Sequence, residues 1–321
     1  MKLDKQSIFW WVFVNRFKEI LKKKNIEFYD KFDIAEISTI KVSAKASLVV
    51  FPKTIKELEG ILCSLWRMRL PYMVVGNISN VLFLRSISFP VIVTSKMKDE
   101  YEVCGNKITV SAGMQLSRFM EILKRHKLGG MEGVFGIPAT VGGAIMNNAG
   151  AFGSQISTNL LRIKVFQDGI VKEINANEIK FGYHYSNLKR LVLLSASFLF
   201  EKKNEYDIIK LYNEYTYRRT TSQPSGLSLG SVYQKVNGMS AGFYIERSGL
   251  KGLRVGGIVV SRKHANFFIN EKNGSSDDFL ELCSKVEWGV EKQFGVSLVC
   301  EIEKVGDDNE IIGRPPHTFK V

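Results

Sequence analysis

Residues 130–153 read Gly130-Met-Glu-Gly-Val-Phe-Gly-Ile-Pro-Ala-Thr-Val-Gly-Gly-Ala-Ile-Met-Asn-Asn-Ala-Gly-Ala-Phe-Gly153. Small residues crowd this stretch beyond what core packing needs, with glycine at Gly136, Gly142, Gly143 and Gly150. A glycine inside a helix costs about 1 kcal/mol relative to alanine, so repeated glycine indicates positive φ angles or backbone that closely approaches a ligand. The stretch therefore predicts a binding site lined by backbone, and a tight structural turn is the alternative.

A second loop with exposed amides is expected upstream, in Tyr72-Met-Val-Val-Gly-Asn-Ile-Ser-Asn-Val-Leu-Phe83. An apolar run, a short polar turn and another apolar run predict a strand, a loop and a strand. Successive backbone N–H groups in such a loop can form a nest that holds an anion.

The order of small residues in 130–153 resembles a segment of the UDP-N-acetylenolpyruvoylglucosamine reductases, the MurB family, which reads G-I-P-G-x-V-G-G-A-x-x-x-N-A-G-A-Y-G. A proline, an Asn-Ala-Gly and several small residues stand at the family spacing, which makes the match specific. Residues 241–252 and 263–267 are similar to two further family motifs, A-G-x-L-I-E-x-A-G-L-K-G and K-H-A-N-F. The resemblance extends from about Ser38 to Gly306 and is nearest to the shorter subgroup, type II.

The resemblance implies that both loops bind FAD, the upstream one through the amides of its G-G-G-S-N motif. Asn77 and Ile78 stand where the family has two of these glycines, and a β-branched Ile78 must keep a negative φ or carry strain. The residues implied to bind the cofactor are Gly76, Asn77, Ile78, Ser79, Asn80, Gly136, Ile137, Pro138, Ala139, Thr140, Gly142, Gly143, Ala144, Asn148, Ala149, Gly150 and Arg219.

Two catalytic residues follow from the resemblance, since reducing an enolpyruvyl ether needs a hydride on one alkene carbon and a proton on the other. Ser231, in Gly230-Ser-Val-Tyr233, is implied to donate the proton; the alternative is a serine that completes a turn. Glu301, in Phe294-Gly-Val-Ser-Leu-Val-Cys-Glu-Ile302, is implied to bind the substrate carboxylate. On a strand, Glu301 and Val299 share one face and Cys300 and Ile302 the other; an exposed charge on an edge strand is the alternative.

His184 is the third predicted catalytic residue and departs from the family pattern. Phe181-Gly-Tyr-His-Tyr-Ser186 has histidine where F-G-Y-R-x-S has arginine, which in the family helps to bind the substrate carboxylate. Histidine is shorter and only partly charged near neutral pH, which predicts lower or more acid-dependent activity. A structural histidine flanked by tyrosines is the alternative. Residues expected to bind the substrate are Tyr183, Gln223, Lys235, Lys251, Arg254 and His264.

Composition narrows the function classes. The 321-residue chain has a net charge of +13, but its lysines are dispersed and no nucleic-acid-binding signature accompanies them, so we expect no nucleic-acid partner. Four widely spaced cysteines show no metal-ligand spacing, which predicts reduced thiols and no metal. The apolar run Ile8–Val14 lacks a cleavage site and is too short to span a bilayer, so we expect a first helix, no membrane insertion and a cytoplasmic location. The oligomeric state stays open, with a monomer expected.

The expected fold is α+β: a two-lobed FAD-binding domain of the PCMH/vanillyl-alcohol-oxidase type and an α+β substrate-binding C-terminal domain. Periodicity and turn signals predict a helix over 54–69 with Thr54 as N-cap, a helix over 117–127 and a helix over 277–294. They also predict a strand pair in 38–52, a linker over 201–217, one strand over 259–270 and a last strand over 296–305. The predicted divisions are 1–30 (N-terminal helical lead), 31–205 (FAD-binding domain), 218–306 (C-terminal domain) and 307–321 (tail).

The function that the resemblance implies is the FAD-dependent, NADPH-oxidising reduction of UDP-N-acetylenolpyruvoylglucosamine to UDP-N-acetylmuramate, a step in peptidoglycan synthesis. Two alternatives stay open. A related flavin oxidase would share the two lobes but not residues 231–270. A nonenzymatic or impaired descendant that binds nucleotide sugar would explain the replaced glycines and the missing arginine.

Overall fold

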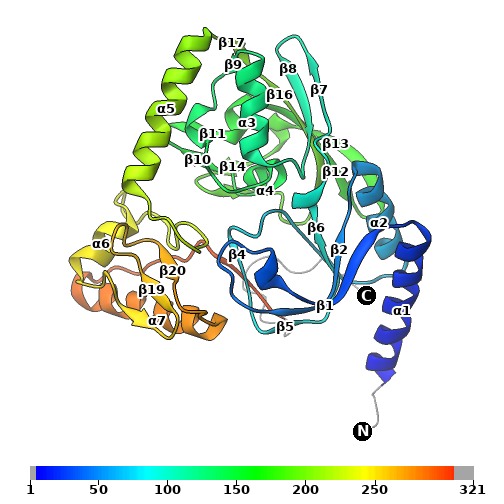
Figure 1. Ribbon diagram of the computed structural model, residues 1–321, viewed down its shortest axis with the longest axis horizontal. Coiled ribbons are helices and arrows are strands. Elements are labelled where there is room, and N and C mark those ends of the chain that lie inside the picture. The colour runs from blue at the N-terminus through cyan, green and yellow to red at the C-terminus, as the bar shows by residue number, and fades with distance from the viewer. Residues whose placement is uncertain (1–4, 307–321) are drawn as a thin grey trace.

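The computed structural model describes residues 5–306, with side chains from Val12 onward, and shows two lobes and a C-terminal domain (Figure 1). The predicted tail over 307–321 lies outside the described residues, as do the side chains of the first part of the apolar run at Ile8–Val14. Within residues 5–306, no helix is both long enough and apolar enough to cross a lipid bilayer.

The first lobe is built on a five-stranded sheet ordered β1-β2-β6-β3, with β5 paired to β2. Alternate residues of β2 enter two cores: Leu48 and Val50 pack against the helices, while Val49 and Phe51 face the opposite core. The elements are α1 (Lys5–Lys23), β1 (Glu27–Asp33), β2 (Lys45–Phe51), α2 (Ile55–Arg67), β3 (Met73–Val75), β4 (Val81–Phe83), β5 (Ser86–Ile87) and β6 (Val91–Val93).

Two local predictions can be compared with this lobe. Thr54 caps α2 as expected, because its side chain accepts a hydrogen bond from the Glu57 amide. The predicted strand pair in 38–52 is wrong, since only β2 forms there and its antiparallel partner β1 lies upstream. Much of β1 lies in the stretch assigned to the helical lead, where alternating charged and aromatic residues gave little apolar contrast.

The second lobe has a five-stranded antiparallel sheet ordered β13-β12-β16-β8-β7, whose inner face packs on α3 and α4. Its sheet strands are β7 (Tyr101–Cys104), β8 (Lys107–Ser111), β12 (Leu160–Gln167), β13 (Ile170–Asn175) and β16 (Val192–Leu199). Its helices are α3 (Leu116–Arg125) and α4 (Val141–Met146). Short strand pairs complete it: β9 (Leu128–Gly129) with β17 (Glu201–Lys202), β10 (Gly150–Ala151) with β11 (Ser154–Gln155), and β14 (Phe181–Gly182) with β15 (Tyr185–Ser186).

A long helix, α5 (Glu205–Ser222), occupies most of the predicted linker and runs from the second lobe down to the C-terminal domain (Figure 1). Asn204 caps its start by accepting a hydrogen bond from the Tyr206 amide. The buried Tyr212 hydroxyl donates to the Met120 carbonyl at 2.8 Å, which fixes the helix on α3. Most of the segment predicted as a linker is therefore a packed helix with few buried positions.

The C-terminal domain packs α6 (Ala241–Arg247) and α7 (Ser276–Phe294) on a three-stranded sheet of β18 (Arg254–Val255), β19 (Ile258–Val260) and β20 (Phe268–Asn270). The single strand expected over 259–270 is wrong, because β19 and β20 are separate strands and His264 lies in the turn between them. The last strand is shorter than expected: only β21 (Glu303–Val305) forms a ladder, preceded by one bridge between Cys300 and Tyr233.

The first lobe and the C-terminal domain share structure. β21 pairs in parallel with β4 of the first lobe, and Ile40, Val42 and Leu82 belong to the core of the C-terminal domain. The Asn270 side chain also donates to the Ile40 carbonyl at 2.9 Å. The domain divisions given above stay predictions.

Candidate active site

The loop between β3 and β4 packs directly on the glycine-rich segment. A Cβ atom at Gly76 would lie 2.3 Å from the Thr140 hydroxyl, so only glycine fits there. The Asn77 side chain donates to the Pro138 carbonyl at 3.0 Å, and Gln115 donates to Asn77 at 3.5 Å. The two segments predicted to bind FAD therefore form one continuous wall.

The backbone of this loop has the form of an anion nest. Within residues 5–306, the amides from Asn77 to Asn80 find no hydrogen-bond acceptor in the protein. Ile78 has a φ of +48° and its side chain, 3% exposed, lies in the core of the first lobe with Ile34 and Phe83. Of the two outcomes expected for Ile78, the strained one is found, and its side chain is directed into that core.

The glycine-rich segment combines an open turn with close packing. Gly136 has a φ of +82°, and a Cβ there would come within 3.1 Å of the Arg219 side chain. At Gly142 a Cβ would lie 2.9 Å from Ala112, and the Gly142 amide already donates to the Ala112 carbonyl. At Gly150 a Cβ would lie 2.8 Å from the Ser154 carbonyl. Packing alone thus explains glycine at 142 and 150, and their contact with FAD stays a prediction.

Arg219 supports this segment from α5. Its guanidinium donates to the carbonyls of Phe135 and Gly133, at 3.1 and 3.2 Å. It also donates to the Gln223 side chain at 3.2 Å. Burial lowers the pKa of the Arg219 guanidinium. Arg219, predicted to bind the cofactor, and Gln223, predicted to bind the substrate, are thus in contact with each other.

Asn148 provides a test of whether the pocket suits a polar cofactor. Its amide nitrogen donates to Gln155 and to the Gly182 carbonyl, both at 2.9 Å, while its Oδ1 is buried without a partner among the described residues. A buried acceptor of this kind needs a donor. The unpaired amides of residues 77–80 need an acceptor in turn. FAD, with a pyrophosphate and a ring that carries an N–H group, supplies both, so the residues present fit it.

The short hairpin of β14 and β15 carries His184 toward the C-terminal domain. Its base is held to the glycine-rich segment by the Asn148 bond to Gly182 and by the Ser186 hydroxyl, which donates to the Met146 carbonyl at 2.6 Å. His184 has a φ of +48°, a left-handed angle that histidine accepts more readily than most side chains. The hairpin turn therefore places an imidazole at the boundary between lobe and domain.

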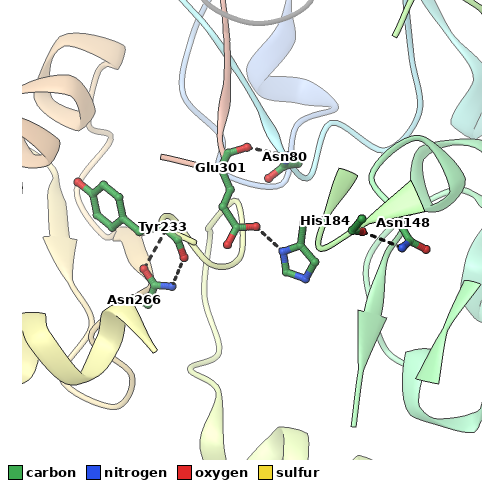
Figure 2. Close-up of polar contacts among 7 residues, drawn as sticks. Asn80, Asn148, His184, Tyr233, Asn266 and Glu301 are labelled. Atoms are coloured by element: carbon green, nitrogen blue, oxygen red, sulfur yellow. Dashed lines mark hydrogen bonds and ion pairs between the residues drawn. The ribbon is translucent and has the colours of Figure 1, made fainter. Parts of the chain in front are cut away.

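His184 and Glu301 meet there. The His184 Nδ1 lies 2.5 Å from Glu301 Oε2 (Figure 2), and the Glu301 side chain is only 10% exposed. The Asn80 side chain donates to the Glu301 carbonyl at 3.1 Å, which connects the nest loop to this segment. The predicted alternation holds, because Cys300 and Ile302 face the core of the C-terminal domain while Val299 is exposed. Glu301 is therefore not a freely solvated charge on an edge strand.

Ser231 lies on the chain beside Glu301. The Glu301 amide donates to the Val232 carbonyl at 2.8 Å, and Ser231 itself forms an antiparallel bridge with Phe267. Among residues 5–306 no hydrogen-bond partner occurs for the Ser231 hydroxyl, which leaves it available to a ligand. Segments predicted from separate motifs thus meet at Glu301: His184 contacts its side chain, and Val232, next to Ser231, accepts from its amide.

Asn266 fixes this arrangement and was missed by the sequence analysis. Its Oδ1 accepts from the Tyr233 amide at 3.0 Å and its Nδ2 donates to the Tyr233 carbonyl at 2.8 Å (Figure 2). The Val232 amide also donates to the Asn266 carbonyl. In the sequence, Asn266 stands between apolar residues in the Lys263–Phe267 motif. This position could have indicated its role, because a buried side-chain amide needs hydrogen-bond partners.

Lys235 and Tyr183 extend the site with positive charge and an aromatic face. Tyr183 stacks on His184 with ring centroids 4.1 Å apart, and the Lys235 ammonium lies 5.7 Å from the centre of the Tyr183 ring. Burial, and then the charge of Glu301, raise the pKa of Tyr183. These two predicted substrate residues therefore border the His184–Glu301 pair.

The other predicted substrate residues lie on the C-terminal domain with partners of their own. Lys251 pairs with Glu246 at 2.6 Å, and Arg254 pairs with Glu271. His264 is half-buried, and burial lowers its pKa, while its Nδ1 accepts from the Asn266 amide at 3.2 Å. Contact of these three with substrate stays a prediction. In the described part of the chain no group of histidine, cysteine and carboxylate side chains could hold a metal ion.

An amide nest, a buried acceptor and a serine–carboxylate–imidazole group on a two-lobed scaffold define a flavin-binding oxidoreductase with a separate substrate domain. Comparisons with known proteins agree. A model described as "FAD binding domain" matches residues 46–174, and one described as "UDP-N-acetylenolpyruvoylglucosamine reductase, C-terminal domain" matches residues 223–305.

The chain belongs to the UDP-N-acetylenolpyruvoylglucosamine reductase family. The reductase of Caldicellulosiruptor bescii is 36% identical over 297 residues, which is 91% of this chain and 95% of the relative. That of Streptococcus pneumoniae, strain Hungary19A-6, is 33% identical over 293 residues, or 90% and 97%. The crystal structure of the Thermus caldophilus enzyme superposes with a TM-score of 0.74 at 29% identity, over 87% of this chain and 98% of that chain. The predicted family and the α+β fold with a PCMH-type FAD domain are confirmed.

Proposed function

We propose that this protein reduces UDP-N-acetylenolpyruvoylglucosamine to UDP-N-acetylmuramate in peptidoglycan precursor synthesis, with FAD bound and NADPH as the reductant. The observation that supports it most is the meeting of three segments at Glu301. The Asn80 side chain, in the loop between β3 and β4, donates to the Glu301 carbonyl. The Glu301 amide donates to the Val232 carbonyl, next to Ser231, and the His184 Nδ1 contacts the Glu301 carboxylate.

FAD, which the residues of the two loops would hold, would supply hydride transfer from NADPH to an alkene carbon of the enolpyruvyl group. The protein has to hold the sugar nucleotide, keep the alkene in place and supply a proton to the other carbon. Ser231 Oγ is the donor that fits, because Ser231 precedes Val232, whose carbonyl accepts from the Glu301 amide, and because its hydroxyl keeps no protein hydrogen bond within residues 5–306. A serine hydroxyl is a weak acid, so the carbon that it protonates must be strongly basic.

Glu301 and His184 act on the substrate carboxylate in this proposal. Two carboxylates repel one another, so a Glu301–substrate contact needs a shared proton or a neighbouring cation. His184 is placed to provide either, because its Nδ1 is in contact with Glu301 and its ring is 29% exposed. Lys235, beyond the Tyr183 ring, adds positive charge for the carboxylate or the diphosphate. In this proposal His184 and Glu301 together bind the substrate carboxylate, which is the role of the family arginine at position 184.

We also infer that the protein is a monomer and that it works in the cytoplasm, where NADPH and nucleotide sugars are formed. The described residues contain no helix able to cross a bilayer, which supports this location. Size-exclusion chromatography with light scattering would test the monomer, and a dimer mass would contradict it.

The proposed reaction is tested with purified protein under anaerobic conditions. NADPH should bleach the flavin absorbance, and the enolpyruvyl sugar nucleotide should restore it, with Ser231→Ala retaining the first step and losing most of the second. A colourless protein that binds the sugar nucleotide would instead support the nonenzymatic descendant. Reoxidation by oxygen but not by the sugar nucleotide would support a flavin oxidase, although the match of residues 223–305 to the reductase C-terminal domain argues against it.

A further inference from the structure

The loop between β3 and β4 has side chains at two positions where the family has glycine, Asn77 and Ile78. Each side chain is held by a different part of the protein. That of Ile78 is buried in the core of the first lobe, and that of Asn77 donates from Nδ2 to the Pro138 carbonyl at 3.0 Å. Asn77 and Pro138 are 61 residues apart in the chain, so this bond joins the two segments that are predicted to bind FAD.

The carbonyl groups of the same loop are also hydrogen-bonded to neighbouring segments. The Ile78 carbonyl accepts from the Thr39 amide at 3.4 Å and from the Thr39 hydroxyl at 3.3 Å. The Asn80 carbonyl accepts from the Glu303 amide at 3.0 Å. These bonds occupy carbonyls and side chains of the loop, whereas the amides of residues 77–80 keep no acceptor within residues 5–306. The loop is therefore held in place with its N–H groups available to an anion.

Glycine at position 77 would give the loop more freedom. Among the described residues of this loop, Ile78 has a positive φ and Asn77 does not, so the backbone at 77 suits an ordinary side chain without strain. A glycine there would add backbone conformations and remove the bond to Pro138. A loop that is already fixed in its binding conformation loses less entropy when the ligand binds, and its affinity is higher for that reason.

We propose that Asn77 is a positioning residue that preorganises the anion nest of residues 77–80 for FAD. Its side chain holds the nest loop against the glycine-rich segment before the cofactor binds. The replacement of the family glycine thus strengthens cofactor binding in this chain. The proposal rests on FAD binding, which is part of the proposed function, and is independent of which substrate FAD reduces.

The experiment compares Asn77→Ala and Asn77→Gly with the unaltered full-length chain after removal of flavin. Isothermal titration calorimetry with FAD gives the Kd, and the recovery of flavin fluorescence on dilution of the loaded protein gives the release rate. Asn77→Ala should weaken FAD binding about 5-fold, because one hydrogen bond is lost. Asn77→Gly should weaken it about 10- to 20-fold, because the loop also gains freedom. Most of the change should be in the release rate.

Gln293→Ala is the matched control. The Gln293 side-chain amide donates to the Arg247 carbonyl at 3.2 Å, across 46 residues of the C-terminal domain and outside both loops. This variant loses a bond of the same kind and should bind FAD as the unaltered protein does. If Gln293→Ala weakened FAD binding as much as Asn77→Ala, the effect would not belong to the nest loop, and the proposal would be wrong.

A direct contact of the Asn77 side chain with FAD is separated from positioning by the flavin-free protein. Nitrogen-15 relaxation of the amides of residues 77–80 should give order parameters near 0.85 in the unaltered chain, about the value of rigid backbone, and below about 0.6 in Asn77→Gly. Weaker FAD binding with unchanged order parameters, or Asn77→Gly with unchanged FAD affinity, would overturn the proposal. An unaltered chain that binds no FAD would contradict the proposed function as well.

Discussion

At position 184 the chain has histidine where the family has arginine. Arginine binds a carboxylate with two parallel N–H groups, whereas an imidazole offers one donor to each side. Here the Nδ1 side is taken by Glu301, so the remaining ring atoms, stacked on Tyr183, are what a substrate can meet. The cationic and titratable groups around this ring are Glu301, Tyr183 and Lys235.

Substitution of His184 tests how much its side chain contributes to turnover. We expect His184→Ala to lose roughly 10- to 100-fold in turnover, since a hydrogen bond to a charged group contributes about 1.5–3 kcal/mol. His184→Arg should retain activity, because a guanidinium can donate to Glu301 and to the substrate carboxylate together. Steady-state NADPH oxidation, with enough enolpyruvyl sugar nucleotide to saturate, is the measurement. A His184→Ala variant with the turnover of the unaltered protein would contradict the role given to His184.

Ile78 presents a second single-residue prediction, about stability. Its left-handed backbone costs about 1–2 kcal/mol, while truncating a buried isoleucine costs about 2–5 kcal/mol. Because burial outweighs strain, Ile78→Gly should destabilise the fold by about 1–3 kcal/mol even though it restores the family glycine. Urea unfolding of the two proteins without added FAD measures this. A glycine variant of equal or higher stability would show that strain dominates.

Among the elements, the segment containing Ser231 forms isolated bridges instead of a strand, and Asn266 also holds it in place. Two side-chain bonds and one backbone bond join Asn266 to residues 232 and 233, in addition to the bridges of Ser231 to Phe267 and of Tyr233 to Cys300. The segment consequently depends on a turn, the one between β19 and β20, for its position.

Removing the Asn266 amide should loosen that segment. We expect Asn266→Ala to destabilise the protein by about 1–3 kcal/mol, because the Tyr233 amide and carbonyl are left buried without partners. Turnover should fall while flavin absorbance and its reduction by NADPH remain. Thermal unfolding and stopped-flow reduction measure the two effects, with Asn270→Ala, which loses bonds to the Ile40 carbonyl and the Gly274 amide, as the comparison. Loss of flavin binding in Asn266→Ala would contradict the assignment.

Motifs in separate parts of the sequence predicted Ser231, Glu301 and His184 as residues of one site, and the structure places His184 against Glu301 and Ser231 next to Val232, which is bonded to Glu301. The catalytic roles of these residues stay predictions. Several secondary-structure elements were not predicted. The missed elements have physical reasons. β1 has charged side chains on an exposed face, and α5 buries few residues because it runs between lobe and domain, so neither has strong periodicity. The Asn80 and Asn266 bonds join residues distant in sequence, which no local pattern reports.

In the molecule as a whole, the C-terminal domain shares a strand pair and a hydrophobic core with the first lobe. β21 completes a pair with β4, Ile40 and Leu82 complete the C-terminal core, and Thr39 donates to the Ser228 carbonyl at 2.7 Å. A domain that could detach as a unit would share less.

This shared core predicts one cooperative unfolding transition. A chain ended at residue 222 would expose Ile40, Val42 and Leu82, all 3% exposed or less in the intact fold, and should be insoluble. Calorimetry of the whole protein should therefore show a single peak with FAD bound. Two resolved peaks, or a soluble and folded 1–222 fragment, would contradict this.

The pairing of β4 with β21 also bears on how the chain acquires its structure during synthesis. Asn80 and Glu301 are 221 residues apart, so the nest loop emerges from the ribosome long before the strand that anchors it. Until translation nears the end, the β4 edge has no partner and its apolar neighbours stay open to water. Contacts this distant slow folding, and chaperones would be expected to guard the nascent chain during that interval.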